Sequence, residues 1–181
     1  MRRVLLRDFI EADRAAFLLY QTDARYLRLY DFADDVERPS QLFDLFLTWQ
    51  SERPRLNFQL GIFEASTGRL VGCGGLRKAD ERSAVLGIEL APSEWGRFRL
   101  AIDATVALLN LGFDTLGLAT IFGDTASGNR RIEKLALWFG AELIAQREGP
   151  AWMQARGWRE FDWSLSREKW QQTKKRLERA L

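Results

Sequence analysis

The segment at residues 85–99, VLGIELAPSEWGRFR, decides the fold of this chain. Its first half, 85–91, is almost wholly apolar, which predicts a buried strand. Pro92 ends that strand, and Gly96 permits a turn before a helical pattern that runs over about 99–113. The amides at the start of a helix are unpaired, and the helix dipole is positive there. This turn is therefore a natural binding place for a phosphate group.

The sequence on either side of this segment continues the alternation of strands and helices. On the N-terminal side we expect a strand, two helices and two strands, at Val4–Arg7, 8–21, 39–53, 57–65 and 70–76. On the C-terminal side we expect a strand, a helix, two strands and a last helix, at 118–123, 129–139, 142–146, 160–165 and from Ser166 onward.

The connections between these elements predict the topology of the sheet. Short turns join the strands at 57–65, 70–76 and 85–91, which is typical of an antiparallel meander. The helix at 99–113 then leads to the strand at 118–123, and such a step is normally a right-handed crossover between parallel strands. The chain of 181 residues is long enough for one sizeable core, so we expect a single mixed α/β domain over 1–181.

The two N-terminal helices carry their own local signals. Asp8 followed by Glu11 has the spacing of a capping box at the start of the first helix. One face of that helix is formed by Ala12, Ala15, Ala16 and Leu19. The second helix has apolar side chains at helical spacing, namely Leu42, Leu45, Phe46 and Trp49.

Composition indicates a soluble globular protein, with 46% hydrophobic and 29% charged residues. No apolar run reaches the length that crosses a bilayer, and Arg7 and Asp8 interrupt the first apolar stretch, so we expect neither a membrane protein nor a secreted one. Cys73 is the single cysteine, which suits a reducing cytoplasm. The net charge of +2 lacks the clustered positive excess of nucleic-acid binders.

The absence of histidine limits the chemistry further. With no histidine and one cysteine, the usual ligands of a zinc site are missing, so we expect no metal. Ser-His-Asp and Cys-His mechanisms are excluded for the same reason. Any acid-base step must use carboxylates, hydroxyls, amines or water.

Several short motifs follow one another in order along the chain. Strand-like motifs are LLRDF at 5–9, GIFE at 61–64, LVGCGGL at 70–76 and LGIELAP at 86–92, the last followed by Trp95-Gly96. Helical positions are marked by Asp103-Ala104 with Phe113 and by Asn129 with Gly140, before DWSL at 162–165 and Trp170. In their order and spacing these motifs resemble the GNAT acetyltransferases, closest to the branch that contains the ribosomal-protein N-terminal acetyltransferases.

The resemblance departs from the family pattern at a few positions. The family loop usually carries two glycines two residues apart, whereas here Gly96 stands alone and Phe98 or Arg99 takes the second place. A tyrosine that often serves as general acid near the helix at 129–139 is missing, because the three tyrosines, Tyr20, Tyr26 and Tyr30, all lie near the N-terminus.

The resemblance implies a GNAT-like fold whose splayed middle strands, at 86–92 and 118–124, hold the arm of acetyl-coenzyme A (acetyl-CoA) as co-substrate. Residues expected to bind it are Leu90, Ala91, Trp95, Gly96, Arg97, Phe98, Arg99, Leu100, Ala101 and Asn129. An amine would attack the thioester directly, with a base to take its proton. The partners implied are acyl-CoA and an amine acceptor, and a homodimer is possible.

Candidate catalytic residues are Glu89, as general base, with Asp124 and Ser127 in the turn after the strand at 118–123. Glu89 interrupts an apolar strand, where burial would make a carboxylate more basic. A solvated strand charge would explain Glu89 equally, ordinary turn chemistry would explain Asp124 and Ser127, and a helix N-cap would explain Asn129.

The acceptor is expected to contact the N-terminal helical region, through Tyr30, Asp34, Asp35 and Trp49. The acidic run Asp31, Asp34, Asp35 and Glu37 would attract a cationic amine, although a solvated loop has the same composition. The acceptor itself, a protein N-terminus or a small amine, stays open. The alternative to an N-acyltransferase is a degenerate GNAT domain that binds coenzyme A or a protein partner without catalysis.

Overall fold

The computed structural model describes residues 3–31 and 35–179, and it divides into two compact units. The first unit comprises Met1–Arg77 and Ile88–Leu108, and the second comprises Lys78–Gly87 and Leu109–Leu181. Strand β4 (Ser83–Leu90) passes from the second unit into the first.

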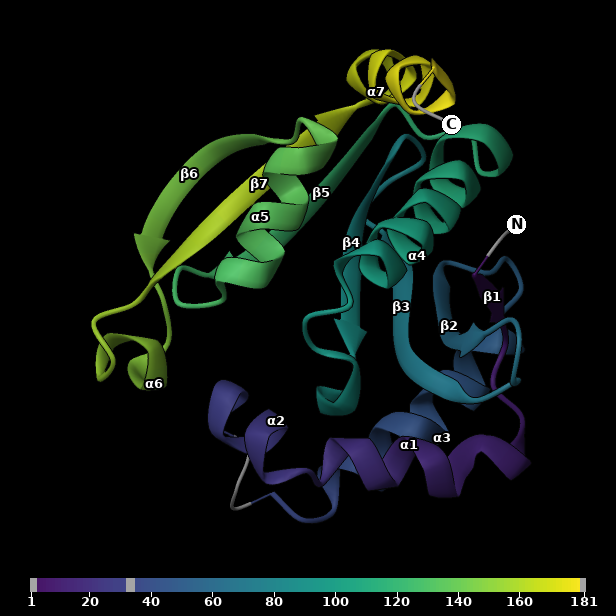
Figure 1. The fold of residues 1–181 in the computed structure, drawn as a ribbon, viewed down its shortest axis with the longest axis vertical. Helices are drawn as coiled ribbons and strands as arrows, with labels where there is room; N and C mark the ends of the chain where they lie inside the picture. Colours follow the sequence, from purple (N-terminus) through teal and green to yellow (C-terminus); the bar gives the residue numbers. More distant parts are fainter. Residues whose placement is uncertain (1–2, 32–34, 180–181) are drawn as a thin grey trace. The chain divides into compact units, whose positions relative to one another are not determined.

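The first unit is built on three antiparallel strands, β1 (Val4–Arg7), β2 (Asn57–Glu64) and β3 (Leu70–Lys78). Its helices are α1 (Arg14–Gln21), α2 (Ala24–Tyr30), α3 (Arg38–Gln50) and most of α4 (Phe98–Asn110). Figure 1 shows α1 and α3 lying side by side next to the β2–β3 pair.

Hydrophobic clusters pack against both faces of these strands. Neighbouring residues of a strand point to opposite faces, and Leu70 and Val71 of β3 accordingly belong to different clusters. The cluster around Leu70 is largely aromatic and includes Phe9, Phe17, Tyr20, Tyr26, Phe43 and Phe46. The cluster around Val71 contains Val4, Ile62, Leu100 and Ala104, so it packs α4 against the strands.

The second unit contains β5 (Thr120–Ala126), β6 (Glu142–Glu148) and β7 (Arg159–Ser166), with β7 antiparallel to both of the others. Its helices are α5 (Arg130–Phe139), the short α6 (Ala151–Gln154) and α7 (Arg167–Arg179), and a π-helical turn, Leu111–Thr115, follows α4.

The seven strands follow the order β1-β2-β3-β4-β5-β7-β6. The β4–β5 pair is parallel, with Ser83–Val85 opposite Thr120–Phe122, whereas the other pairs described above are antiparallel. This confirms the expected mixed α/β sheet and the strand–helix–strand step. The paired register of β4 and β5 covers three residues of each strand, although both strands continue beyond it.

The first helix differs from its sequence-based prediction. Asp8 does not cap it, because the Asp8 carboxylate binds Arg55 at 2.6 Å. A 3-10 turn, Glu11–Asp13, comes first, and Asp13 accepts a hydrogen bond from the Ile10 amide at 2.9 Å. The buried face of α1 carries Phe17, Tyr20 and Gln21, while the predicted face is exposed at Ala12, Ala15, Ala16 and Leu19. Aromatic side chains bury more apolar area than alanines, so their face of the helix turns inward.

The end of β5 and the buried face of α3 also differ from the sequence-based prediction. Strand β5 ends at Ala126 rather than at 123, so Asp124 lies inside a strand and not in the turn after it. Helix α2 is a separate element, because Asp23 caps its N-terminus by accepting from the Arg25 amide. Within α3 the buried positions are Pro39, Phe43 and Phe46, and Leu45 is exposed.

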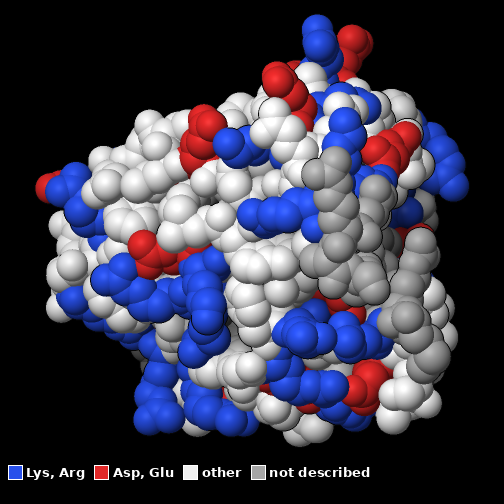
Figure 2. Space-filling view, turned by 45° about the horizontal axis from the view of Figure 1, so that its top comes forward, with Lys and Arg blue, Asp and Glu red and all other residues white. Residues whose placement is uncertain are grey.

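On the face drawn in Figure 2, basic and acidic side chains are interspersed among uncharged ones. None of the helices in the described part of the chain is both long and apolar enough to cross a bilayer. Within residues 3–31 and 35–179, no three acidic, histidine or cysteine side chains come together as metal ligands would.

Candidate active site

The carboxylate of Glu89 lies in the first unit, where side chains from α1, α2 and β3 surround it. Its Oε1 accepts hydrogen bonds from the Tyr20 hydroxyl at 2.8 Å, from Gln21 Nε2 at 2.5 Å and from the Cys73 thiol at 3.3 Å. Its Oε2 accepts from the Tyr26 hydroxyl at 2.7 Å. Such donors compensate a carboxylate for the water it loses on burial, so Glu89 is held in one orientation.

Two of the groups that contact Glu89 are held in turn by further hydrogen bonds. Arg38 Nη1 donates to Gln21 Oε1 at 3.3 Å, which leaves the amide nitrogen of Gln21 pointing at Glu89. Gln59 Nε2 contacts the Cys73 sulfur at 3.2 Å. Both tyrosines belong to the aromatic cluster, and their ring centroids are 6.1 Å apart.

The tyrosine hydroxyls remain protonated donors at neutral pH. Burial, together with the neighbouring Cys73 and Glu89, raises the pKa of Tyr20 well above its usual value. Burial and the Glu89 charge likewise raise the pKa of Tyr26. Burial and Glu89 also raise the pKa of the Cys73 thiol, so Cys73 is not activated as a nucleophile.

The two oxygens of Glu89 differ in what they can still accept. Oε1 receives three donors and Oε2 receives one, counting the residues that the structure describes. A carboxylate oxygen has two lone pairs in its plane, so Oε2 retains a position for a further proton or water. Glu89 as a whole is only partly buried.

Directly after Glu89, the chain forms the turn expected to receive the pyrophosphate. A 3-10 turn, Pro92–Glu94, leads to Gly96, whose φ is +98°, and α4 then begins at Phe98. A side chain at Gly96 would meet no atom within 4 Å, so glycine is needed here for its backbone conformation and not for space.

The turn has the donors that a pyrophosphate requires. The amides of Arg97, Phe98, Leu100 and Ala101 bond to carbonyls within the turn, whereas those of Gly96 and Arg99 have no acceptor among the described residues. The Arg99 side chain is exposed, and the first turn of α4 has no acidic residue. Unpaired amides and an exposed arginine at the N-terminal end of a helix, where the helix dipole is positive, favour an anionic group such as a diphosphate.

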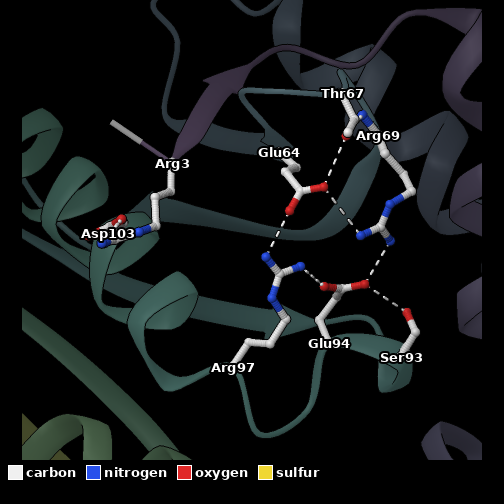
Figure 3. Close-up of polar contacts among 8 residues, drawn as sticks. All are labelled: Arg3, Glu64, Thr67, Arg69, Ser93, Glu94, Arg97 and Asp103. Atoms are coloured by element: carbon white, nitrogen blue, oxygen red, sulfur yellow. Dashed lines mark hydrogen bonds and ion pairs between the residues drawn. The ribbon is translucent and has the colours of Figure 1, made fainter. Parts of the chain in front are cut away.

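Other residues expected to bind acetyl-CoA make hydrogen bonds, ion pairs or packing contacts within the protein. Ala91 donates its amide to the Val71 carbonyl at 2.9 Å, and the Leu90 carbonyl accepts from Trp95 Nε1 at 3.0 Å. Leu100 is buried against the strands. The Arg97 guanidinium binds Glu94 at 2.5 Å and Glu64 at 2.8 Å, as Figure 3 shows, so it is held away from a direct phosphate contact.

Asp124, Ser127 and Asn129 belong to the second unit. Asp124 is exposed and stands opposite Asp162 across the β5–β7 pair. The Ser127 hydroxyl oxygen accepts from the Arg159 amide at 3.0 Å, so it closes the end of that pair. Asn129 is buried at the N-cap position of α5, and within the described chain its side chain makes no capping bond.

The expected acceptor residues are only partly brought together. Tyr30 packs on Tyr26 with ring centroids 4.9 Å apart, which places it beside the Glu89 cluster. Trp49 instead packs on Phe46, with ring centroids 5.6 Å apart, and lies partly buried against the aromatic cluster. Asp35 is exposed and accepts a hydrogen bond from the amide of Arg38, the first residue of α3, at 3.1 Å, while Asp34 lies outside the described residues.

Sequence reasoning missed Tyr20, Gln21 and Tyr26. They are 69, 68 and 63 residues from Glu89 along the chain. The available signal was that a buried carboxylate needs hydrogen-bond donors, but nothing local indicates which donors those are.

Comparison with known proteins identifies the family and the fold. Residues 3–142 match the acetyltransferase (GNAT) domain family. The chain belongs to the GNAT acetyltransferase family. This makes it an acyl-CoA-dependent N-acetyltransferase with acetyl-CoA as co-substrate, and it confirms the family expected from the sequence. The narrower placement in the ribosomal-protein branch stays a prediction.

Solved structures of GNAT proteins share the fold. A spermidine N-acetyltransferase from Vibrio cholerae, in complex with CoA and spermine, matches with a TM-score of 0.78 and 18% identity over 93% of this chain and 98% of that one. A GNAT-family acetyltransferase from Bacillus anthracis matches with a TM-score of 0.71 and 19% identity over 92% and 96%. A search of curated protein sequences finds no match.

Proposed function

We propose that this GNAT acetyltransferase transfers the acetyl group to a primary amine, on a protein N-terminus or a small molecule, with Glu89 as general base. One observation carries the proposal. Glu89 is a partly exposed carboxylate, fixed by Tyr20, Gln21 and Tyr26, on the strand that leads into the turn at Gly96.

In the proposed reaction the neutral amine attacks the thioester carbonyl carbon. A nitrogen–carbon bond forms, the carbon–sulfur bond breaks, and coenzyme A leaves as its thiolate. Oε2 of Glu89, directly or through one water, takes the proton that the nitrogen loses. A free thiol has a pKa of about 8.5, so the thiolate is a tolerable leaving group without a dedicated acid.

The hydrogen-bond donors around Glu89 keep its carboxylate in place during this step. Tyr20 and Gln21 hold Oε1, and Tyr26 fixes Oε2 from one side. A base held in this way loses little orientational freedom when the amine arrives.

A cationic amine is the acceptor class that the surroundings favour. Asp31, Asp35 and Glu37 are exposed close to α2 and the start of α3, the helices that supply Tyr26 and Arg38 to the Glu89 cluster. Exposed carboxylates raise the local concentration of cations. The fold shared with a spermidine N-acetyltransferase agrees with an amine acceptor.

The test is turnover of Glu89→Gln at saturating acetyl-CoA, with spermidine, a peptide bearing a free N-terminus and a neutral amine as acceptors. Glutamine keeps the size and much of the hydrogen bonding but is not a base, so we expect turnover to fall by about 10²–10⁴. Glu81→Gln, at an exposed turn, is the matched control.

Acetyl-CoA affinity, measured by calorimetry, should be unchanged in Glu89→Gln. Near-normal turnover would transfer the base role to Asp124 or to bulk water. If the wild-type protein binds acetyl-CoA but acetylates no amine of the panel, the alternative of a non-catalytic coenzyme A-binding module holds instead.

A further inference from the structure

Four charged side chains join the β2–β3 hairpin to the turn before α4. Glu64 and Arg69 come from the hairpin, and Glu94 and Arg97 come from the turn that contains Gly96. Figure 3 shows them facing one another in a closed ring in which acidic and basic groups alternate. We refer to these four residues as the charge ring.

Each carboxylate of the charge ring contacts both guanidiniums. Glu94 binds Arg69 at 2.7 Å through Oε1 and Arg97 at 2.5 Å through Oε2. Glu64 binds Arg97 at 2.8 Å and Arg69 at 3.5 Å. The Ser93 hydroxyl adds a bond to Glu94 at 3.1 Å. The ring therefore fixes the turn to the hairpin from several directions.

Burial separates Glu94 from an ordinary surface ion pair. Its side chain is 4% exposed, whereas those of Arg69 and Arg97 are 49% and 46% exposed. Most exposed ion pairs contribute little, but a buried carboxylate depends on its partners, and removing one of them leaves an uncompensated charge. Glu94 is thus the member of the ring that holds the turn in place.

The charge ring begins two residues before Gly96 and closes one residue after it. Glu94 and Arg97 therefore flank Gly96, and Arg99, whose amide is also unpaired among the described residues, follows two residues after Arg97. Since Arg97 is engaged with Glu64 and Glu94, the ring orients the backbone of the turn without supplying a phosphate ligand itself.

We infer that Glu94, held by Arg69 and Arg97, is a positioning residue for coenzyme A, which keeps the amides at Gly96 and Arg99 aimed at the pyrophosphate. This inference rests on the proposed function, because it requires acetyl-CoA to bind at the turn.

Glu94→Gln separates positioning from simple electrostatics. The change removes one negative charge close to where an anionic ligand binds, so electrostatic attraction alone would make acetyl-CoA bind more tightly. Positioning requires the reverse, because glutamine has a single acceptor oxygen and no charge with which to hold two guanidiniums.

Asp103→Asn is the matched control. Asp103 lies on α4 and pairs with Arg3 at 3.1 Å, outside the charge ring (Figure 3). Both substitutions remove one negative charge from the first compact unit, but only Glu94→Gln opens the charge ring.

The experiment is calorimetry of acetyl-CoA binding to wild type, Glu94→Gln and Asp103→Asn, with turnover at saturating acetyl-CoA. We expect Glu94→Gln to raise the dissociation constant about tenfold while turnover at saturation changes by less than about twofold. Asp103→Asn should leave affinity unchanged or slightly tighter. A dissociation constant for Glu94→Gln equal to or below that of wild type would overturn the inference.

Arg69→Lys keeps the test decisive if Glu94→Gln does not fold. Lysine retains the charge but cannot bridge both carboxylates as the planar guanidinium does, so affinity should again fall and turnover at saturation should persist. Unchanged affinity in a folded Arg69→Lys would equally overturn the inference. If wild type itself fails to bind acetyl-CoA, the proposed function fails. If wild type binds it and the variants bind equally well, only the positioning role fails.

Discussion

Replacing Tyr26 by phenylalanine tests whether the donors around Glu89 matter as the geometry indicates. Tyr26 gives Oε2 its one hydrogen bond from the described residues, at 2.7 Å, whereas Tyr20 shares Oε1 with Gln21 and Cys73. A hydrogen bond to a charged group contributes about 1.5–3 kcal/mol. Tyr26→Phe should therefore cost about 2 kcal/mol of unfolding free energy, and Tyr20→Phe about half of that because two donors remain.

For a chain of this length, a loss of about 2 kcal/mol lowers the melting temperature by about 4–8 °C. The assay is urea unfolding followed by tryptophan fluorescence, with a thermal scan of the same samples. Repeating Tyr26→Phe in a Glu89→Gln background supplies the cross-check, since a bond to a neutral acceptor contributes about 0.5–1.5 kcal/mol and the cost should shrink accordingly.

The comparison between the two tyrosines is the decisive one. If Tyr26→Phe is no more destabilising than Tyr20→Phe, the oxygens of Glu89 do not differ in the way that their partners suggest. The choice of Oε2 as the proton-accepting atom would then lose its support.

Two further predictions concern the turn and the charge ring. Gly96→Ala should destabilise the fold by about 1–2 kcal/mol, because a residue with a Cβ disfavours the φ of +98° at this position even though the space around it is open. The substitution should also weaken acetyl-CoA binding. An unchanged free energy of unfolding and an unchanged affinity would contradict this prediction. Burial alone would raise the pKa of Glu94, but hydrogen bonds from Arg69 and Arg97 outweigh it and hold that pKa below its usual value. The folded pKa of Glu94 is thus the lower one, so its contribution is complete above the unfolded value of about 4.3 and is lost as the pH falls through the folded pKa. The urea midpoint should therefore decrease more between about pH 6 and about pH 3 in wild type than in Glu94→Gln. An equal decrease in both proteins would refute the assignment.

The sequence by itself determined the order of the elements and the position of the turn. Strand and helix periodicity, with Pro92 and Gly96 as breaks, are local properties of the backbone, and they located β4, the turn and α4 to within a few residues. Glu89 was also found locally, as the one charge in an apolar strand.

Only the tertiary structure decided what surrounds that charge. Tyr20, Gln21 and Tyr26 reach Glu89 because α1 turns its aromatic face inward and α2 follows it, and local spacing had indicated the opposite face of α1. The charge ring likewise joins Arg69 to Glu94 and Glu64 to Arg97, which are 25 and 33 residues apart. Periodicity reports which residues share a face of one element. Which faces meet depends on how much apolar area each buries and on which donors a buried carboxylate finds, and both are settled by packing between elements distant in sequence.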